Sequence, residues 1–246
     1  METVAERTDG YDLRIADTAD QLAHAVAEAM VQKVSQTLAR QAHFSLVLSG
    51  GSTPQRLYRL LASEYAQGVE WQRVHLFWGD ERYVPHDHPA SNYRLVRETL
   101  IEPLQLPAEN VHPMPTHLAV PDDAARLYEG ELRAFFGETP RFDLVLLGMG
   151  ADGHTASLFP NTAAVQERER WVAVGEAPVE PRRRLTLTFA ALNAAKMVYF
   201  LVIGADKAEA VRRVLVERAP LPAALVLPSA GKPVWWLDRD AAQALW

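Results

Sequence analysis

The stretch "FSLVLSGGSTPQRLYRLL", residues 44 to 61, decides the class of fold. Its first six residues form a continuous apolar run, which is typical of a strand buried on both faces of a parallel sheet. "GGSTP" follows, and we expect a helix with Thr53 as its N-cap and Pro54 as its first residue. A buried strand, a glycine turn and a helix together predict one repeat of an α/β protein.

The same alternation continues on both sides of this stretch. Apolar runs at 73–80, 142–149 and 197–203 predict strands, as do "YDLRIAD", "RLTLT", "AALVL" and "PVWWL". Helices are expected at 17–41, 91–102, 121–136 and 205–218, and a last one at "RDAAQALW". This order favours a mostly parallel sheet with helices on both faces. Because no repeat or low-complexity linker divides the chain, we expect a single domain over residues 1–246.

Composition excludes several classes of function. The 246 residues include no cysteine, which rules out disulfides, thiolate metal sites and cysteine nucleophiles. The formal net charge of −6 argues against a nucleic-acid surface, and it requires that any anion site gather its cations locally. We find neither an apolar run of membrane-spanning length nor a secretory signal in "METVAERTDGYDLRIADTAD", so we expect no membrane partner and a cytoplasmic location.

Ligands of open α/β sheets bind outside the carboxyl ends of the strands, so the residues that follow each strand matter most. After the strand at 44–49 come Gly50, Gly51, Ser52 and Thr53. Their backbone N–H groups and hydroxyls, at a helix N-terminus, can form a phosphate cradle. The alternative is an ordinary glycine turn. The lysine of a nucleotide P-loop and the G-x-G-x-x-G spacing are both missing, so a nucleotide is not predicted.

The second strand exit, "FWGDERYVPHDHPASNYR", places Asp80, Glu81 and Arg82 together. Charges at such a place are either a solvated turn or part of a site. His86 and His88 are two residues apart in a loop flanked by prolines, and no third ligand is evident. We therefore expect an exposed loop here and no metal.

The third exit is "GMGADGHTASLFP", residues 148–160. Its glycines permit a tight turn, on which Asp152 and His154 can point into one cavity. Histidine is the side chain best suited to move a proton near neutral pH. The alternative is a helix that begins with Asp152 as its cap. No G-x-S-x-G motif is present, so a covalent serine route is not expected.

Two groups of cations lie further on. Arg182, Arg183 and Arg184 precede the strand "LTLT", and Lys207 follows the strand at 197–203. Taken alone, each is a solvated surface group. Beside an anion site, they would supply the local positive charge that an acidic protein needs.

The blocks "LSGGSTP", "WGDERYVP", "SNYR", "FDLVLLGMGADGHTASLFP", "RRRLTLT" and "IGADKA" resemble those of the 6-phosphogluconolactonases, in the same order. The wider superfamily also contains glucosamine-6-phosphate isomerases/deaminases. The resemblance implies a Rossmann-like three-layer α/β/α sandwich that hydrolyses 6-phospho-D-glucono-1,5-lactone to 6-phosphogluconate in the oxidative pentose phosphate pathway. It implies no cofactor, no metal and only a small-molecule partner, in a monomer or small homo-oligomer.

The resemblance also implies roles for single residues. His154 would take a proton from the attacking water, Asp152 would hold the imidazole, and Arg82 would offset negative charge at the phosphate or the oxyanion. The substrate-binding residues would be Gly50, Gly51, Ser52, Thr53, Asp80, Arg82, Thr155, Arg184 and Lys207. Among the three consecutive arginines, the spacing to "LTLT" points to Arg184.

Two other functions are compatible with parts of this pattern. The isomerases carry a carboxylate five residues after the histidine, where this chain has Phe159, and they lack an arginine at the position of Arg82. Both differences favour the lactonase. The second is a non-catalytic sugar-phosphate-binding module of a transcription regulator. The intact His154 argues against it, and so does the expected first strand near residue 11, which would leave no room for a DNA-binding segment.

Overall fold

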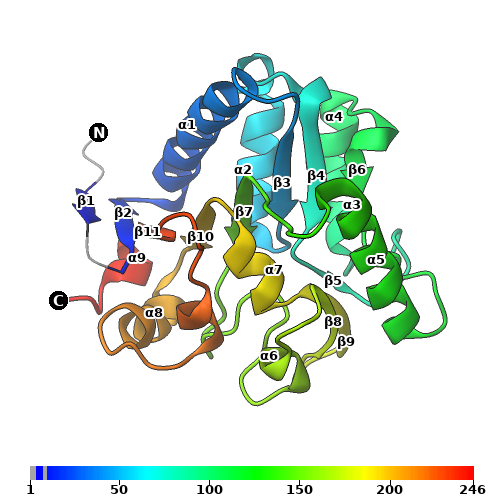
Figure 1. Ribbon diagram of the computed structural model, residues 1–246. Helices are drawn as coiled ribbons and strands as arrows, with labels where there is room; N and C mark the ends of the chain where they lie inside the picture. Colours follow the sequence, from blue (N-terminus) through cyan, green and yellow to red (C-terminus); the bar gives the residue numbers. More distant parts are fainter. Residues whose placement is uncertain (1–3, 8–9) are drawn as a thin grey trace.

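Eight strands form the central sheet of the computed structural model, which describes residues 4–7 and 10–246 (Figure 1). Their order across the sheet is β1-β2-β11-β10-β7-β3-β4-β6. Their bounds are β1 Val4–Arg7, β2 Asp12–Ala16, β3 Phe44–Leu48, β4 Val74–Trp78, β6 Val111–His112, β7 Leu144–Leu147, β10 Val198–Val202 and β11 Val234–Asp238.

The sheet is parallel except at one edge, where β1 pairs antiparallel with β2. Every residue of β3, β7 and β10 is buried, as the apolar runs predict for strands covered on both faces. β3 lies between β4 and β7, so the chain leaves it toward one side of the sheet and returns on the other. Such a reversal opens a crevice at the carboxyl ends of the strands.

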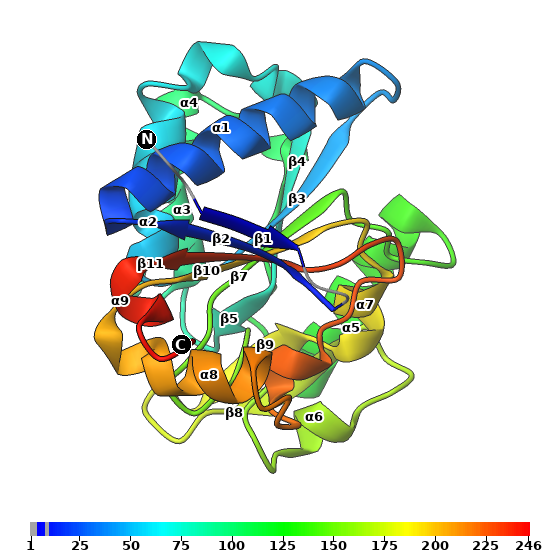
Figure 2. The same cartoon turned by 90° about the vertical axis from the view of Figure 1, so that its left-hand side faces the viewer.

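Helices cover both faces, and the predicted α/β architecture is confirmed. Figure 2 shows α1 on one side of the sheet and α8 on the other. The helices are α1 Ala19–Leu38, α2 Ser52–Ala62, α3 Asn92–Val96, α4 Glu102–Leu104, α5 Pro121–Phe136, α6 Ala163–Gln166, α7 Phe189–Ala194, α8 Ala208–Leu215 and α9 Arg239–Ala242. Within the described part of the chain, no helix has the length and apolarity needed to cross a membrane.

Helix α1 illustrates why these segments fold locally. The Thr18 side chain accepts a hydrogen bond from the backbone N–H of Gln21 at 3.2 Å, so it is the N-cap. Apolar residues four apart then form one buried face, each contributing about 1.5–3 kcal/mol when removed from water. They are Leu22, Val26, Met30, Val34 and Leu38.

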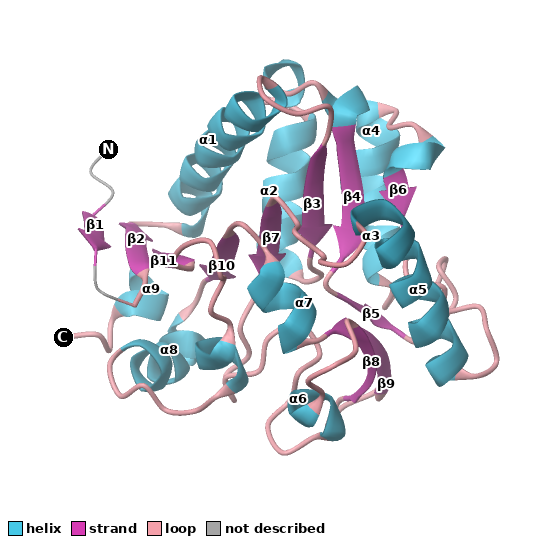
Figure 3. Cartoon of the chain, in the orientation of Figure 1, coloured by secondary structure: helices cyan, strands magenta, loops and turns pink. Residues whose placement is uncertain are grey.

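A second sheet of three antiparallel strands was not predicted. It consists of β5 Asp80–Arg82, β9 Arg183–Leu187 and β8 Val172–Glu176, in that order. Figure 3 shows it beyond the ends of β3 and β4. The register places Arg82 opposite Arg184 and Asp80 opposite Thr186. This sheet therefore brings charged residues from two distant parts of the chain to the same edge of the fold.

Other local predictions need correction. Helix α2 begins at Ser52 with Gly51 as its N-cap, two residues earlier than the predicted Thr53 cap with Pro54 as the first helical residue. The segment predicted as a strand at "AALVL" is largely a 3-10 turn, Pro222–Leu225, because a proline with fixed φ and no N–H favours the first turn of a helix. The predicted helix 91–102 is interrupted by a π-helical segment, Arg97–Ile101, between α3 and α4.

Candidate active site

A cavity of about 280 Å³ lies where the carboxyl ends of β3, β4, β7 and β10 meet. All three strand exits singled out in the sequence contribute to its wall, together with Lys207. The predicted residues that line it are Gly50, Gly51, Ser52, Thr53, Asp80, Arg82, His154 and Lys207. Asp152, Thr155 and Arg184 do not line it themselves.

Asp152 fixes the imidazole of His154. Its Oδ1 lies 2.5 Å from Nδ1 of His154 and also accepts the backbone N–H of His154 at 3.1 Å. Since an ionised carboxylate can only accept, the ring nitrogen facing it carries the proton, and Nε2 of the neutral ring has a free lone pair. Gly150 makes room for this arrangement: a Cβ there would lie 2.1 Å from Nδ1 of His154.

The environment keeps Asp152 ionised. Burial alone would raise its pKa, but the hydrogen bonds from the backbone and the ring of His154 outweigh burial and lower the pKa below its ordinary value. The other side of the imidazole packs on Phe159, with ring centroids 4.1 Å apart. The residue that stands where isomerases carry a carboxylate is thus a packing partner of the histidine.

The glycine turn leads directly into the N-terminus of α2. Gly51 has φ of 107°, a conformation that suits glycine, and its carbonyl accepts the N–H of Gln55 at 3.2 Å. The first N–H groups of a helix have no partner within the helix, so those of Ser52 and Thr53 are available to an anion. Ser49, the residue before the two glycines, is held in place by Tyr58. The Tyr58 hydroxyl donates to the carbonyl of Ser49 (2.8 Å) and accepts from its N–H (3.0 Å).

Arg82 and Arg184 are neighbouring cations on adjacent strands. Arg82 lines the cavity and donates from Nη1 to the carbonyl of Ala90 at 2.7 Å, while Arg184 is 6% exposed. In each, Nε is buried and has no hydrogen-bond partner among the described residues. The pKa of Arg184 is lowered, mainly because the side chain is buried and also because Arg82 is a like charge nearby. Two adjoining guanidinium groups with unused donors favour an anion between or beside them.

Lys207 supplies a third cation from the opposite wall. It ends the 3-10 turn Ala205–Lys207 after β10, and its Nζ lies 2.9 Å from Oδ2 of the exposed Asp206. The hydrogen bond from Lys207 lowers the pKa of Asp206. Because Asp206 is in water, this pair holds Lys207 only weakly and leaves it available to a ligand.

Asp80 and Thr155 have structural partners. Oδ2 of Asp80 accepts the hydroxyl of Ser157 at 2.6 Å, and the side chain is 8% exposed at the cavity wall. The hydroxyl of Thr155 is buried and donates to the carbonyl of Gly148 at 2.8 Å. This bond joins the two ends of residues 148–155, which we call the histidine loop. A direct substrate contact of Thr155 stays a prediction.

Two residues of this region were missed in the sequence, and Glu81 was noted there without a role of its own. Ser49 and Asn92 line the cavity, and Glu81 is buried just behind it. Glu81 accepts backbone N–H groups of Arg82, Asn92 and Tyr93, each at 2.7 Å, so it joins β5 to the start of α3. Burial raises the pKa of Glu81 to about 7 in spite of these bonds. The only sequence signal for Asn92 is its place in "SNYR", and apolar periodicity cannot show it.

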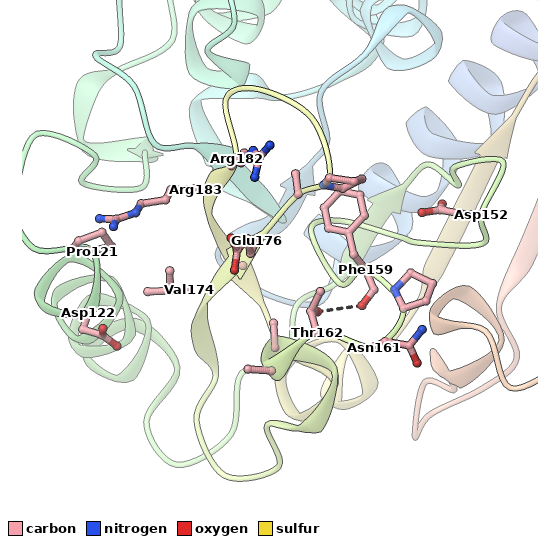
Figure 4. A pocket seen from close by; sticks show the side chains of 16 residues that line it. Pro121, Asp122, Asp152, Phe159, Asn161, Thr162, Val174, Glu176, Arg182 and Arg183 are labelled. Atoms are coloured by element: carbon pink, nitrogen blue, oxygen red, sulfur yellow. Dashed lines mark hydrogen bonds between the residues drawn. The ribbon is translucent and has the colours of Figure 1, made fainter.

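A larger cavity of about 900 Å³ lies on the other side of the histidine loop (Figure 4). Arg182 and Arg183 line it, together with Asp152 and Phe159. The arginines of the run at 182–184 therefore separate: the first two line this outer cavity, and Arg184 faces Arg82.

The two histidines of "HDH" have backbone partners. His86 hydrogen-bonds through Nε2 to the carbonyl of Met114 at 2.9 Å, and Nδ1 of His88 accepts the N–H of Ala90 at 3.0 Å. Within residues 4–7 and 10–246, no group of three His, Asp or Glu side chains has the arrangement of a metal site.

Comparisons with known proteins agree on one family. The family model for glucosamine-6-phosphate isomerases/6-phosphogluconolactonase matches residues 17–235. A 6-phosphogluconolactonase of Synechocystis is 42% identical over 87% of this chain and 89% of its own length, and that of Homo sapiens is 42% identical over 95% and 93%. The solved 6-phosphogluconolactonase of Thermotoga maritima is 35% identical, with a TM-score of 0.83 over 92% of this chain and 99% of that one.

The fold alone does not separate the two activities of this family. A monomeric glucosamine-6-phosphate deaminase has a TM-score of 0.80 at 21% identity, over 94% of this chain and 99% of that one. The separation must therefore come from side chains in the cavity.

Proposed function

The chain belongs to the glucosamine-6-phosphate isomerase/6-phosphogluconolactonase family, and we propose that it hydrolyses 6-phospho-D-glucono-1,5-lactone to 6-phosphogluconate in the oxidative pentose phosphate pathway. One observation carries the proposal. A histidine held by a carboxylate lines the same cavity as a glycine cradle and two cations. A lactone with a distant phosphate needs both parts, a base at one end and an anion site at the other.

The reaction begins with a water near C1 of the lactone. Nε2 of His154 takes a proton from this water as its oxygen attacks the carbonyl carbon, which gives a tetrahedral oxyanion. When the bond between C1 and the ring oxygen breaks, the imidazolium returns the proton to that oxygen, which becomes a hydroxyl. Asp152 stabilises the imidazolium between the two steps and keeps the ring in the required tautomer.

The phosphate end provides orientation. The N–H groups of Ser52 and Thr53 and the cation Lys207, which all line the cavity, would hold the dianion, and Arg184, opposite Arg82 on the neighbouring strand, would add positive charge. Binding energy far from C1 would then fix the reacting carbon beside His154. Arg82 also lines this cavity and would serve either the phosphate or the developing oxyanion.

The deciding assay is acid release from freshly made 6-phosphogluconolactone, compared with the unphosphorylated lactone and corrected for uncatalysed hydrolysis. We expect a strong preference for the phosphorylated substrate. His154→Ala is expected to lower kcat by about two to four powers of ten, the usual contribution of a general base. Equal rates on both lactones would refute the anion site, and near-normal turnover by His154→Ala would remove this residue from its role.

The deaminase activity of the same family is not expected. The position that would need a carboxylate holds Phe159, whose ring packs against His154 and cannot transfer a proton. The measurement is ammonia release from glucosamine 6-phosphate by the purified protein, and a rate comparable with lactone hydrolysis would reverse this assignment.

We further propose that the chain acts as one domain, as a monomer or small homo-oligomer, in the cytoplasm. The cysteine-free composition supports a reducing compartment. Light scattering coupled to size exclusion measures the oligomeric state directly.

A further inference from the structure

Ser157 joins the chain segment that follows His154 to the small three-stranded sheet. The residue is 1% exposed. Its hydroxyl donates to Oδ2 of Asp80 on β5 at 2.6 Å, and its backbone N–H donates to the hydroxyl of Thr186 on β9 at 3.2 Å. Because Asp80 and Thr186 are opposite each other in the β5–β9 ladder, Ser157 is bound to both strands at one register position.

The third strand of the small sheet also lies against Ser157. A Cβ at Gly175 on β8 would lie 2.8 Å from the carbonyl oxygen of Ser157, which is closer than real Cβ contacts allow. Glycine at this position therefore lets β8 approach the backbone of Ser157. The hydroxyl, the N–H and the carbonyl of Ser157 thus each lie against a different strand of the small sheet.

The backbone just before Ser157 needs such an anchor. Ala156 has φ of 48°, in the left-handed region that residues with a Cβ adopt only at a cost. The turn around it is closed by the N–H of Leu158, which donates to the carbonyl of Thr155 at 2.9 Å. Strained backbone of this kind persists where surrounding contacts fix it, and it occurs often at functional sites. Ser157 supplies two of these contacts directly after the strained residue.

The position of the His154 ring depends on residues on both sides of it in the chain. Asp152 lies 2.5 Å from Nδ1, and the ring of Phe159 packs on the imidazole with ring centroids 4.1 Å apart. Phe159 comes two residues after Ser157, so a shift of the anchored turn would move His154 and Phe159 together. A displacement of about 1 Å in a reacting group can lower a rate by about a hundredfold.

We propose that Ser157 is a positioning residue that acts on the reaction through His154, by fixing the segment after the histidine to the small sheet. The inference rests on the proposed function, in which His154 moves the proton. Ser157 is buried and does not line the cavity, so it acts without touching the substrate. Arg82 and Arg184 lie on the same two strands that bind Ser157, so the small sheet sets the geometry between the base and these cations.

The test compares kcat, KM and product binding in wild type and Ser157→Ala, which removes one hydroxyl. Calorimetric titration with 6-phosphogluconate gives the fraction of each protein that is folded and able to bind. We expect kcat on 6-phosphogluconolactone to fall about ten- to hundredfold, with KM and the stoichiometry of product binding unchanged. Partial unfolding would lower the stoichiometry, and a lost substrate contact would raise KM.

A double-mutant cycle tests whether the effect passes through the histidine. Ser157→Ala is measured again in the His154→Ala background, with uncatalysed hydrolysis subtracted. Once the imidazole is absent, its position no longer matters, so no further loss is expected.

Two variants of Thr186 separate hydrogen bonding from packing. Thr186→Val keeps the shape of the side chain but removes the acceptor of the Ser157 N–H, so kcat is expected to fall as in Ser157→Ala. Thr186→Ser keeps the acceptor and loses a methyl group, and kcat is expected to stay near the wild-type value. Packing alone predicts the opposite order, because Thr186 is fully buried and the loss of a buried methyl group weakens packing.

Ser45→Ala is the matched control. Ser45 is also 1% exposed, and its hydroxyl donates to Oδ2 of the buried Asp143 at 2.9 Å. This pair lies at the amino ends of β3 and β7, whereas the cavity lies at their carboxyl ends. The same kind of buried bond is lost, and kcat is expected to equal that of wild type.

The outcomes are distinguishable. The inference is overturned if Ser157→Ala and Thr186→Val keep wild-type kcat, if kcat falls equally in Ser45→Ala, or if Ser157→Ala loses the same factor with and without His154. It is also overturned if KM rises while kcat is kept, because Ser157 would then act on substrate binding. If Ser157→Ala does not fold, the order of the two Thr186 variants decides. If wild type turns over no lactone above background, the proposed function itself is overturned, and this inference with it.

Discussion

Replacing Asp152 by asparagine tests whether the carboxylate acts only through His154. The change keeps the size of the side chain and removes its charge. The structure gives Asp152 two bonds to His154, at 2.5 Å to the ring and 3.1 Å to the backbone. An amide oxygen can still accept both bonds, so the loop is expected to keep its shape while the imidazolium loses its counter-charge.

The expected size of the effect follows from this geometry. A hydrogen bond to a charged group contributes about 1.5–3 kcal/mol, which corresponds to roughly ten- to hundredfold in kcat. The Asp152 side chain is 45% exposed, so water screens its charge and the loss is expected near the lower end. KM is expected to change little, because Asp152 is not among the residues that line the cavity and so does not contact the anion site.

The assay is a double-mutant cycle on the phosphorylated lactone. Asp152→Asn is measured in wild type and again in the His154→Ala background, with uncatalysed hydrolysis subtracted. When a residue acts only through another, its loss has no effect once the other is gone. Asp123→Asn is the control, because Asp123 is an exposed carboxylate that pairs with Arg126 on the surface of α5.

One result would refute this reasoning. If Asp152→Asn lowers kcat by the same factor with and without His154, the carboxylate has its own role in the reaction, and the assigned relation between the two residues is wrong.

The remaining predictions concern the anion site, the histidine loop and a buried carboxyl. Lys207→Ala and Arg184→Ala are expected to raise KM about tenfold or more with kcat nearly kept; unchanged KM in both would contradict the phosphate assignment. Gly150→Ala places a Cβ 2.1 Å from the ring of His154, so we expect it to abolish most activity while circular dichroism stays native. Because the folded pKa of Glu81 is raised from 4.5 to about 7, the folded state binds more protons between these values, and its contribution to stability falls by about 3 kcal/mol as pH rises from 4.5 to 7. Urea unfolding at several pH values measures this slope; a slope as steep in Glu81→Gln would show that another group causes it.

The sequence predicted those parts of the fold that depend on local pattern. The apolar strand at 44–48 and the four-residue spacing on α1 both follow from burial against a sheet, and both are confirmed. The sequence also predicted that the residues after these three strands would lie together, because the carboxyl ends of parallel strands lie at the same edge of a sheet. Here a general rule of topology was enough to bring Gly50, Asp80 and His154 together.

Other features depend on contacts that no local pattern encodes. The small sheet forms because Asp80–Arg82 pairs with Arg183–Leu187 about a hundred residues later. The alternation in "RLTLT" predicts the second strand but not its partner, and the first strand is too short to show a period. Asn92 and Ser49 have ordinary polar side chains in the sequence. They stand out only once burial shows that an oxygen of each lacks a partner among the described residues.

The small sheet places two positive charges opposite each other, on β5 and β9, and this has a consequence for the stability of the protein without ligand. Arg82 on β5 faces Arg184 on β9, and the two like charges repel across the ladder, a repulsion that Asp80 and Glu81 nearby offset in part. A dianion in the cavity turns this repulsion into attraction, and the ligand then contributes to holding β8 and β9 in place. We expect heat, salt and proteases to distinguish the empty from the occupied state first at residues 172–187. If the proposed phosphate site is correct, the phosphoryl group would complete a part of the fold as well as being recognised by it.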